Sequence, residues 1–495
     1  MTTIGILGGG ISGLSAAFHL SRRLAANTKA RIVLLERTKR LGGWIKSDNT
    51  TIHAAGKACP LVLETGPRSL RPRSLEMLEL IHLLGLESAL SLIPYSHPAA
   101  RNRFVYFSET GITRLPSDMA SLLRSQFVDR ASLGGLLPSA LAEIFKGANK
   151  PEGVTDESFD EFISRRFGAD FARRFGSSLI HGIYAADSRK LSMRAAFGPV
   201  WEAEMDGGGS VVRGFLWKSR GKKSSLGSEL ELGRMLDIMK GVSVYTFRNG
   251  MESVSRALNT ALQTSPQIEI RTEEDIRSIR LSEDSENLVV DTSSGLFTFS
   301  HVISTLPLPI LSEKLPTSRP LPHLHYNPHS SVHVANIVFP PPSAPIHPPG
   351  FGYLVPRPLA DYRSSTCPVL GCVFDSTVSS KSRPTVVTMM LGGPFSLPSE
   401  PIPLNQLLSI LAGHLGAESL PEPLAYRYHV QKDCIPTPLV GHLDRMAELR
   451  DAVQQDWNGR LQVIGSGVGG VSLGDCVRGG RTAALNIVDS LTSSS

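Results

Sequence analysis

The sequence predicts an α/β protein built around a parallel sheet to which separate parts of the chain contribute strands. Three observations lead to this prediction. A buried strand, a glycine-rich turn and a helix follow one another in TIGILGGGISGLSAAFHL, residues 3–20. The same order returns in LQVIGSGVGGVSLGDCVRGGRTAALNIV, residues 461–488. Between them, HVISTLP has the pattern of a strand that rejoins the first sheet.

The first segment has the spacing G-x-G-x-x-G, from Gly8 to Gly13. Gly8 permits a tight turn, Gly10 lets a phosphate approach the backbone, and Gly13 lets the helix pack close to the strand. The helix N-terminus would then face an anion with free N–H groups and the positive end of its dipole. We therefore expect a diphosphate to be held by Gly8, Gly9, Gly10, Ile11, Ser12 and Gly13.

Glu36 ends the next predicted strand, RIVLLE, about 20 residues after the glycines. A carboxylate at this position accepts hydrogen bonds from ribose hydroxyls and would repel the additional phosphate of NADP. NAD and FAD remain as candidates. The glycine-rich turn near residue 465 favours FAD, because two such turns suit a long ligand that stays bound. Close packing of the following helix is the alternative explanation of that second turn.

The composition indicates a globular protein of two or three domains, with 495 residues, 41% hydrophobic and 19% charged. The formal net charge of +6 would suit an anionic membrane surface or an anionic substrate. Because the charges are scattered and carry no nucleic-acid-binding motif, we expect no nucleic acid partner. Five cysteines without a C-x-x-C pair favour a reduced compartment over a disulfide framework or a zinc site. No apolar run reaches the roughly 18 residues that span a bilayer, so any membrane contact is expected at the surface.

Helical patterns fill much of the first half of the chain. Residues 74–84 predict a leucine-rich helix, and residues 97–200 predict a mainly helical region. The stretch ASLGGLLPSALAEIF, residues 131–145, is expected either in a core or in an interface. Residues 206–231 are rich in Gly, Ser and Lys and predict an exposed loop. One apolar stripe within the helical region consists of Phe159, Phe162, Ile163 and Phe167.

The second half of the chain is richer in β patterns. Short runs in IEIRT, IRSIRL, NLVVDT and LFTF precede HVISTLP. After a proline-rich connector, residues 316–349, the segments GFGYLVP, VLGCVFDS and TVVTMML predict an antiparallel sheet. In the last glycine-rich segment, Asp475 is expected to be the helix N-cap.

Four histidines stand close together in the sequence: His323, His325, His329 and His333. Pro328 and the valine-rich run that follows predict a loop and then a strand, in which this spacing does not converge on a metal ion. We therefore predict no metal site.

These motifs, in this order, resemble those of amine-oxidase-type flavoproteins and, within them, the family of protoporphyrinogen oxidases of the eukaryotic, mitochondrial type. The similarity runs from residue 4 to about residue 488 and is carried by GGGISG, RLGGW, ETGPRSLRP, ISTLP, GFGYLVP, MMLGG and GVSLGDCVRGG. HPAARNRF and GIYAADSRKLSMRAAF favour the narrower family, because general amine oxidases do not share them. Two departures are FRNGME, in place of the usual double glycine, and a longer, more basic loop at 206–231.

The resemblance implies a Rossmann-like FAD-binding domain assembled from discontinuous segments, an α+β substrate domain with an antiparallel sheet, and a mainly α-helical membrane-binding insert. The implied boundaries are 1–90, 242–312 and 446–495 for the FAD-binding domain, 91–205 for the insert, and 206–241 and 313–445 for the substrate domain.

It also implies one non-covalent FAD per chain. The stiff Gly66-Pro67 turn has no bulky side chain, which lets the backbone approach a flat ring. Beyond the diphosphate turn and Glu36, the implied FAD contacts are Arg37, Trp44, Gly66, Pro67, Arg68, Ser69, Ile276, Val430, Val471, Ser472 and Leu473.

The implied substrate is protoporphyrinogen IX, a tetrapyrrole with two propionates, oxidised in two-electron steps with dioxygen reoxidising the flavin and giving hydrogen peroxide. Arg103 in ARNRF would bind a propionate bidentately. The walls of an apolar slot would be Phe351, Gly352, Leu354 and Met390, although alternating apolar residues on a strand also suit an ordinary core. We expect no dedicated catalytic acid or base, because the cofactor carries the hydride transfer.

The resemblance further implies monotopic attachment to the mitochondrial inner membrane, or to the cytoplasmic membrane of a bacterium. A homodimer and the preceding and following enzymes of haem synthesis are further candidate partners. Other functions remain open: oxidation of coproporphyrinogen III, of an amine or of a polyene, and a flavin-free protein of this fold that binds prenylated GTPases.

Overall fold

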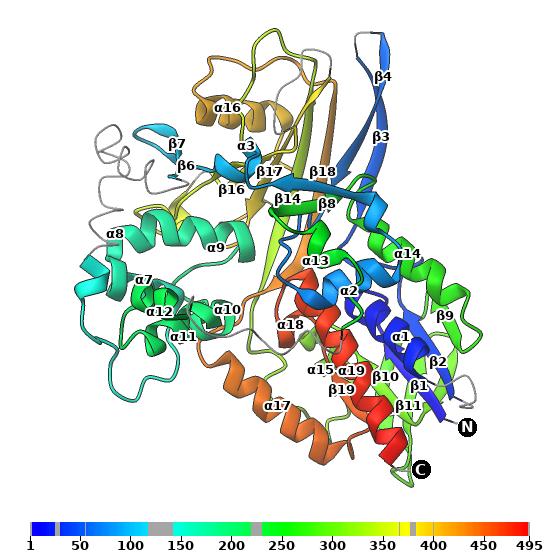
Figure 1. Cartoon of the computed structure of the whole chain (residues 1–495). Coiled ribbons are helices and arrows are strands. Elements are labelled where there is room, and N and C mark those ends of the chain that lie inside the picture. The colour runs from blue at the N-terminus through cyan, green and yellow to red at the C-terminus, as the bar shows by residue number, and fades with distance from the viewer. Residues whose placement is uncertain are drawn as a thin grey trace.

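The computed structural model describes residues 2–24, 30–54, 56–116, 142–218, 230–365, 367–376, 383–398 and 400–493. Figure 1 shows an antiparallel sheet at the top, a parallel sheet with its helices at the lower right, and a helical lobe at the lower left. The strands of the parallel sheet come from the blue, green and orange parts of the chain, which lie far apart in the sequence.

Five parallel strands form one sheet in the order β19-β13-β1-β2-β9. The pairing of Ile4 with His301 confirms the prediction that HVISTLP rejoins the first sheet. The two central strands are continuous apolar runs, as expected of a parallel sheet that is covered on both faces. In the order given, the strand bounds are Leu461–Val463, His301–Ser304, Thr2–Leu7, Ala30–Glu36 and Ile268–Thr272.

Helices α1 (Ile11–Arg23) and α19 (Leu473–Ser493) pack together against one face of this sheet. Ser15 Oγ donates a hydrogen bond to the carbonyl oxygen of Val477, at 3.0 Å. A Cβ atom at Gly480 would lie 2.5 Å from the carbonyl oxygen of Ser12, so this glycine permits the close approach of the two helices.

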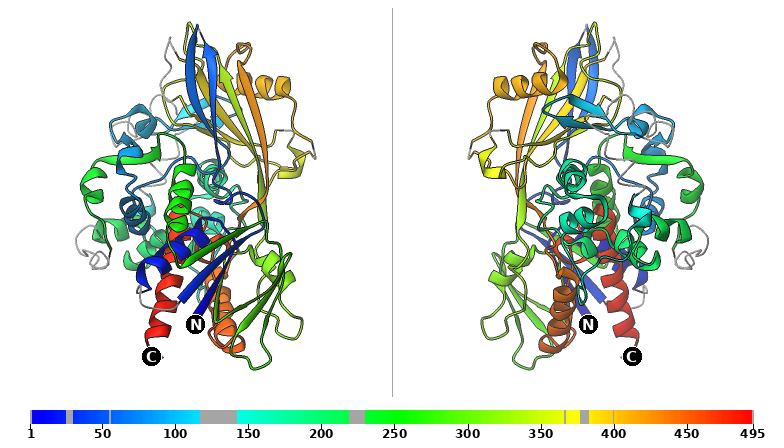
Figure 2. Two further views of the ribbon diagram at one scale, coloured as in Figure 1. Left: turned by 90° about the vertical axis from the view of Figure 1, so that its right-hand side faces the viewer. Right: turned by 90° about the vertical axis from the view of Figure 1, so that its left-hand side faces the viewer.

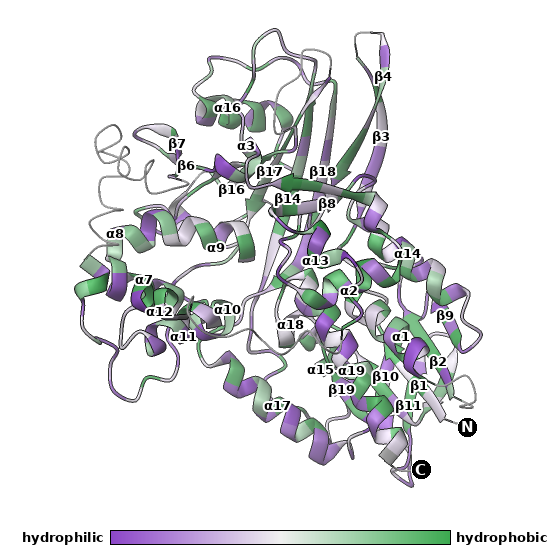
Figure 3. Ribbon diagram, in the orientation of Figure 1, coloured by the Kyte–Doolittle hydropathy of each residue, from purple (hydrophilic) through white to green (hydrophobic). Residues whose placement is uncertain are grey.

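A three-stranded antiparallel meander and two helices cover the opposite face. Leu7 and Val33 of the parallel sheet share a buried cluster with Val290 of the meander and Trp457 at the end of α17. Figure 3 shows hydrophilic and hydrophobic residues interspersed along α17, as in a helix with one buried face. The bounds are Ile276–Leu281 for β10, Leu288–Thr292 for β11, Gly295–Phe299 for β12, Leu308–Lys314 for α15 and His442–Asp456 for α17.

The second large sheet has seven strands in the order β18-β14-β17-β16-β15-β6-β7. It confirms the antiparallel sheet predicted from GFGYLVP, VLGCVFDS and TVVTMML; the parallel β15–β6 pair is an exception within it. Helix α16 (Leu404–Leu415) packs on it. The strand bounds are Ala425–Pro436, His329–Phe339, Thr385–Gly392, Val369–Phe374, Gly352–Leu354, Phe104–Phe107 and Gly111–Arg114.

One expectation needs correction at this sheet. Residues 97–200 were expected to be mainly helical, but β6 and β7 lie in this segment and extend the sheet. This error arises because cross-strand partners distant in the sequence, and not local periodicity, stabilise these strands. The strand predicted after Pro328 is β14, which interrupts the proline-rich connector at 316–349 and pairs with both β17 and β18.

Smaller elements join the two sheets. The hairpin of β3 (Ser47–Ala54) and β4 (Lys57–Glu64) packs on the antiparallel sheet through Leu63, Val338 and Val386. Figure 2 shows this hairpin, in blue, standing beside that sheet in both views. The other elements are α2 (Leu75–Leu83), a 3₁₀ turn (Glu87–Ala89), β5 (Leu90–Pro94) paired with β8 (Val242–Phe247), α3 (Pro98–Arg101), α13 (Met235–Ile238), α14 (Glu252–Gln263), a second 3₁₀ turn (Tyr362–Ser364) and α18 (Ser466–Gly469).

The helical lobe begins with α7, whose N-terminus has a reciprocal capping box between Ser158 and Glu161. Phe159, Phe162 and Ile163 are buried, which confirms the predicted apolar stripe in its first turns. The bounds in this lobe are Phe159–Phe167 for α7, Ala169–Phe171 for α8, Ala172–Gly176 for a π-helical turn, Ser177–Tyr184 for α9, Met193–Ala196 for α10, Gly198–Asp206 for α11 and Val211–Lys218 for α12.

The predicted loop at 206–231 is wrong in its first part, because α12 occupies residues 211–218 there. Residues 219–229 lie outside the described part of the chain, as does most of the stretch 131–145. Among the described helices, none combines the length and hydropathy that a bilayer span requires.

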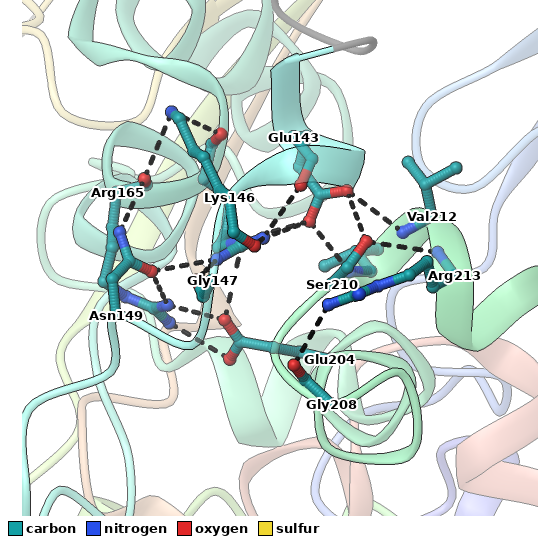
Figure 4. Close-up of polar contacts among 12 residues, drawn as sticks. Glu143, Lys146, Gly147, Asn149, Arg165, Glu204, Gly208, Ser210, Val212 and Arg213 are labelled. Carbon is teal, nitrogen blue, oxygen red and sulfur yellow. Dashed lines mark hydrogen bonds and ion pairs between the residues drawn. The ribbon is translucent and has the colours of Figure 1, made fainter.

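A buried network of charges holds this lobe together (Figure 4). Arg166 Nη2 lies 2.7 Å from Glu143 Oε1, and both side chains are fully buried. The Glu143 carboxylate also accepts hydrogen bonds from Ser210 Oγ and from the backbone N–H groups of Val211 and Val212, at the start of α12. Burial by itself raises the pKa of Glu143, but these hydrogen bonds outweigh it and hold the pKa below its usual value.

Candidate functional site

A cavity of about 1170 Å³ lies between the two large sheets. Its first end is formed by both glycine-rich turns and by the carboxyl ends of β1, β2, β13 and β19. Its second end is formed by the antiparallel sheet and the helical lobe. Ligands of open α/β sheets bind outside the carboxyl ends of the strands, and pockets for one drug-sized ligand enclose roughly 300–1,000 Å³. The cavity is therefore large enough for a cofactor and a substrate together.

The first glycine-rich turn has the geometry that its sequence predicts. Gly8 has φ of +102°, and a Cβ atom there would lie 2.6 Å from Thr305 Oγ1. A Cβ atom at Gly13 would overlap the carbonyl oxygen of Gly8. Gly10 lines the cavity, and a Cβ atom there would have no neighbour within 4 Å. The space in front of Gly10 is thus open at the N-terminus of α1, where an anion would be bound.

The Glu36 side chain connects the end of β2 to this turn by a hydrogen bond. Its Oε2 accepts a hydrogen bond from the N–H of Gly9, and its Oε1 accepts one from the N–H of Thr38, each at 2.8 Å. Glu36 lines the cavity together with Arg37 and Ile276. The carboxylate thus lies beside the diphosphate turn, as expected of a group that binds ribose hydroxyls.

The second glycine-rich turn lines the same cavity through Gly465 and Gly467. Its helix, α19, begins differently from the prediction. Ser472 Oγ accepts a hydrogen bond from the N–H of Asp475, and the Asp475 carboxylate accepts hydrogen bonds from Ser472, so Ser472 is the N-cap and Asp475 is the third helical residue. The prediction of Asp475 as N-cap was wrong because it did not account for this reciprocal capping.

The Gly66-Pro67-Arg68 turn forms part of the cavity wall. A Cβ atom at Gly66 would overlap the carbonyl oxygen of Trp44, so this turn packs directly on the neighbouring backbone. Arg68 Nη1 donates to Asp375 Oδ1 at 2.7 Å, while its Nη2 is buried without a partner among the described residues. An unpaired buried donor in the wall suits a ligand with hydrogen-bond acceptors, such as the ring nitrogen and carbonyl oxygen atoms of a flavin.

Most of the residues expected to contact FAD line this cavity. Those that do are Gly8, Gly10, Ile11, Ser12, Glu36, Arg37, Trp44, Gly66, Pro67, Arg68, Ser69, Ile276, Val471 and Leu473. The lining does not include Gly9, Gly13 and Ser472. These residues support the turns instead: Gly9 and Ser472 form hydrogen bonds, and Gly13 permits close packing.

Val430 is also outside this lining. It pairs with His333 across the sheet, and 40% of its surface is exposed. The adjacent Gln431 lines the cavity instead and donates a hydrogen bond to the carbonyl oxygen of Thr65. Side chains alternate along a strand, so a displacement of one residue changes the face on which a side chain lies.

All five residues expected at the substrate line the second end of the cavity: Arg103, Phe351, Gly352, Leu354 and Met390. Gly352 has φ of +139°, and a Cβ atom there would lie 2.9 Å from Cα of Val373. The backbone of the slot wall therefore lies directly on β16.

One wall of the slot was not predicted from the sequence. It comes from the π-helical turn and α9 and includes Phe175, Leu179, Gly182 and Ile183. Leu179 and Ile183 are 38% and 44% exposed although they are apolar, because they face the cavity. The π-helical turn marks this wall in the structure, because such turns occur frequently at functional sites. No sequence pattern predicts a π-helical turn, so this wall was missed.

The four clustered histidines do not converge. His323 Nε2 lies 2.6 Å from a carboxylate oxygen of Glu448, and His333 Nδ1 lies 2.7 Å from the hydroxyl of Tyr428. His329 lines the cavity, and burial lowers its pKa. Within the described ranges, no group of three or more His, Cys, Asp or Glu side chains is arranged to hold a metal ion.

The family model described as "Flavin containing amine oxidoreductase" matches residues 11–488 of the chain. Protoporphyrinogen oxidase of Schizosaccharomyces pombe is 30% identical over 518 aligned residues, which cover 100% of both chains. Protoporphyrinogen oxidase of Homo sapiens is 32% identical over 507 aligned residues, which cover 98% of each chain. A crystal structure from Exiguobacterium sp. 255-15 has the same fold, with a TM-score of 0.76, 22% sequence identity and 98% coverage of each chain.

Proposed function

The chain belongs to the family of flavin-containing amine oxidoreductases and is an FAD-dependent oxidoreductase, and from this premise we propose that it oxidises protoporphyrinogen IX to protoporphyrin IX. Dioxygen is the electron acceptor. The similarity to curated protoporphyrinogen oxidases over the full length of the chain supports this substrate.

One structural observation carries the proposal. A single cavity runs from the two glycine-rich turns to an apolar slot whose lining includes Arg103. FAD would extend from the first turn and Glu36 to the Gly66-Pro67 turn. A flat, apolar substrate with anionic edges would then lie between the antiparallel sheet and α9, with a carboxylate on Arg103.

When bound, FAD accepts a hydride from a substrate carbon and passes the two electrons to dioxygen, which gives hydrogen peroxide. Each step also releases one proton from the substrate, and one proton is taken up when hydrogen peroxide forms, so there is no net change in protons. The protein's residues would orient the substrate and exclude bulk water, and the proposal assigns no acid or base to the chain. Phe351, Leu354 and Met390 supply the apolar walls for this purpose.

In this proposal the two sheets and the helical lobe have different functions. The parallel sheet and its helices would hold FAD, the antiparallel sheet would hold the substrate, and the helical lobe would attach the protein to one face of a membrane. The lobe exposes Met205, Phe215 and Trp217, which are 64%, 47% and 59% exposed, and Phe145, which is 86% exposed. Such side chains favour an interface with lipid, where a poorly soluble substrate is concentrated. The inner mitochondrial membrane is the location we propose.

Aerobic oxidation by the purified holoenzyme tests the substrate. Protoporphyrinogen IX is expected to yield porphyrin fluorescence together with hydrogen peroxide, and coproporphyrinogen III is expected to react more slowly at equal concentration. A preference for coproporphyrinogen III, or no turnover of either compound by protein that retains its flavin, would overturn the proposal.

A further inference from the structure

Two arginines line the substrate end of the cavity without a counter-charge among the described residues. Arg71 and Arg103 both lie in the cavity wall. No carboxylate of the described residues forms an ion pair with either guanidinium. Arg68, in the same segment as Arg71, differs because its guanidinium is paired with Asp375. Only Arg103 was expected from the sequence to bind the substrate.

The backbone around each arginine is well anchored. Leu70, next to Arg71, exchanges two hydrogen bonds of 2.8 Å with Tyr245 of β8. The carbonyl oxygen of Arg103 accepts a hydrogen bond from the N–H of Leu115, and its neighbour Asn102 accepts one from the N–H of Phe351. Both cations are therefore carried on segments that are fixed to strands, and Arg103 is next to the slot wall.

The electrostatics of the pair favour an anion. Burial lowers the pKa of Arg103, and partial burial together with the charges of Arg103 and Arg73 lowers the pKa of Arg71, which is an exposed residue in the cavity wall. Each shift means that the charged form is disfavoured in the protein without ligand. A ligand carboxylate beside each guanidinium would remove this penalty and form charge-assisted hydrogen bonds.

We propose that Arg71 is a second carboxylate-binding residue of the substrate site, so that Arg71 and Arg103 each bind one propionate of a porphyrinogen. This inference rests on the proposed function. The two propionates of protoporphyrinogen IX are on neighbouring pyrrole rings, and two neighbouring cations match them. A substrate with four carboxylates would place two of them, unpaired, against apolar walls, which makes Arg71 a determinant of specificity as well as of affinity.

The test uses the product, protoporphyrin IX, which has the same two propionates and can be titrated against the holoenzyme by fluorescence. We expect Arg71→Gln to weaken binding by about tenfold or more, and we expect the same of Arg103→Gln. The matched control is Arg73→Gln, which removes a charge two residues away that is exposed, as that of Arg71 is, but lies outside the cavity lining. Arg71→Lys is expected to restore part of the affinity.

The dimethyl ester of protoporphyrin separates direct contact from a change in structure. Wild type and Arg71→Gln are expected to bind the diester equally, because it has no carboxylate for Arg71. Equal binding of the free acid by wild type and Arg71→Gln would overturn the inference, as would a tenfold loss for Arg73→Gln or for the diester. A wild-type holoenzyme that binds no protoporphyrin would instead overturn the proposed function. Flavin absorbance of each variant establishes that it is folded.

Discussion

Gly182 of α9 and Leu354 of β15 lie in direct contact across the slot: a Cβ atom at Gly182 would be 2.8 Å from Leu354 Cδ2. The glycine therefore sets how closely the helical lobe approaches the antiparallel sheet. Both residues line the cavity, so this contact sets the width of the slot at that point.

Gly182→Ala is expected to push the Leu354 side chain into the slot. Overpacking of this kind costs about 1–3 kcal/mol, and a cost of this size in the substrate complex corresponds to a loss of roughly 5- to 150-fold in kcat/KM for protoporphyrinogen IX, with the FAD content unchanged. Steady-state kinetics on flavin-replete protein measure the effect. Gly413→Ala, in α16 and with open space around its Cβ position, is the control and is expected to match wild type. An unchanged kcat/KM in Gly182→Ala would contradict this account of the slot.

Gly10→Val is expected to yield protein that purifies without flavin. The Cβ position of Gly10 is open in the structure because it faces the cavity, so a valine side chain would occupy the place of the diphosphate. The absorbance ratio of flavin to protein measures the loss. Gly413→Val serves as the control for the general cost of valine at an open glycine, and full flavin occupancy in Gly10→Val would rule out this position for the diphosphate.

Stability is expected to fall as the pH drops below about 6.5. Burial lowers the pKa of His414 to about 4 and that of His181 to about 4, from the ordinary value of 6.5. The folded protein keeps these rings neutral, so their contribution is complete above the unfolded pKa and is lost as the pH falls toward the folded pKa. Each histidine accounts for up to about 1.4 kcal/mol per pH unit in this window.

The melting temperature of His414→Gln, measured from pH 7 to pH 5, tests the pH dependence. Glutamine can keep a hydrogen bond to the Tyr353 hydroxyl, which lies 2.9 Å from His414 Nδ1, but it does not titrate. We expect the variant to lose less stability on acidification than wild type, whereas His53→Gln, at an exposed position, follows wild type. Identical slopes for His414→Gln and wild type would contradict the assignment.

The membrane proposal predicts that Phe215→Ser combined with Trp217→Ser weakens binding to lipid vesicles. Removing two apolar side chains of this size from an interface costs roughly 1.5–3 kcal/mol each, or roughly 10- to 150-fold in partitioning per residue. Co-sedimentation of the holoenzyme with vesicles that contain anionic lipid measures this. Leu359→Ser removes an 84% exposed leucine from another part of the chain and should have no effect. Equal effects of the two changes would argue against a patch on α12.

The sequence predicted well wherever local sterics dictate the structure. Local sequence is enough to predict a turn at Gly8, which has φ of +102°, and a buried strand at the apolar run of β1. The predictions failed where a distant partner decides the outcome. Strands β6 and β7 are held by cross-strand neighbours, and Ser472 becomes the N-cap through its reciprocal bonds with Asp475. Val430, which was expected to contact the cofactor, lies outside the cavity lining, and its neighbour Gln431 is part of that lining.

The features of the functional site fall into the same two groups, those that local sequence predicts and those that tertiary contacts determine. The sequence alone established two glycine-rich turns, a carboxylate at Glu36 and a motif that contains Arg103, because each of these is a local pattern. Only the tertiary structure brought both turns to one cavity, placed α9 opposite the sheet and set Arg71 in the wall with Arg103. Packing between segments hundreds of residues apart determines these relationships. Such long-range contacts produce no periodic pattern in the sequence, so sequence patterns do not predict them.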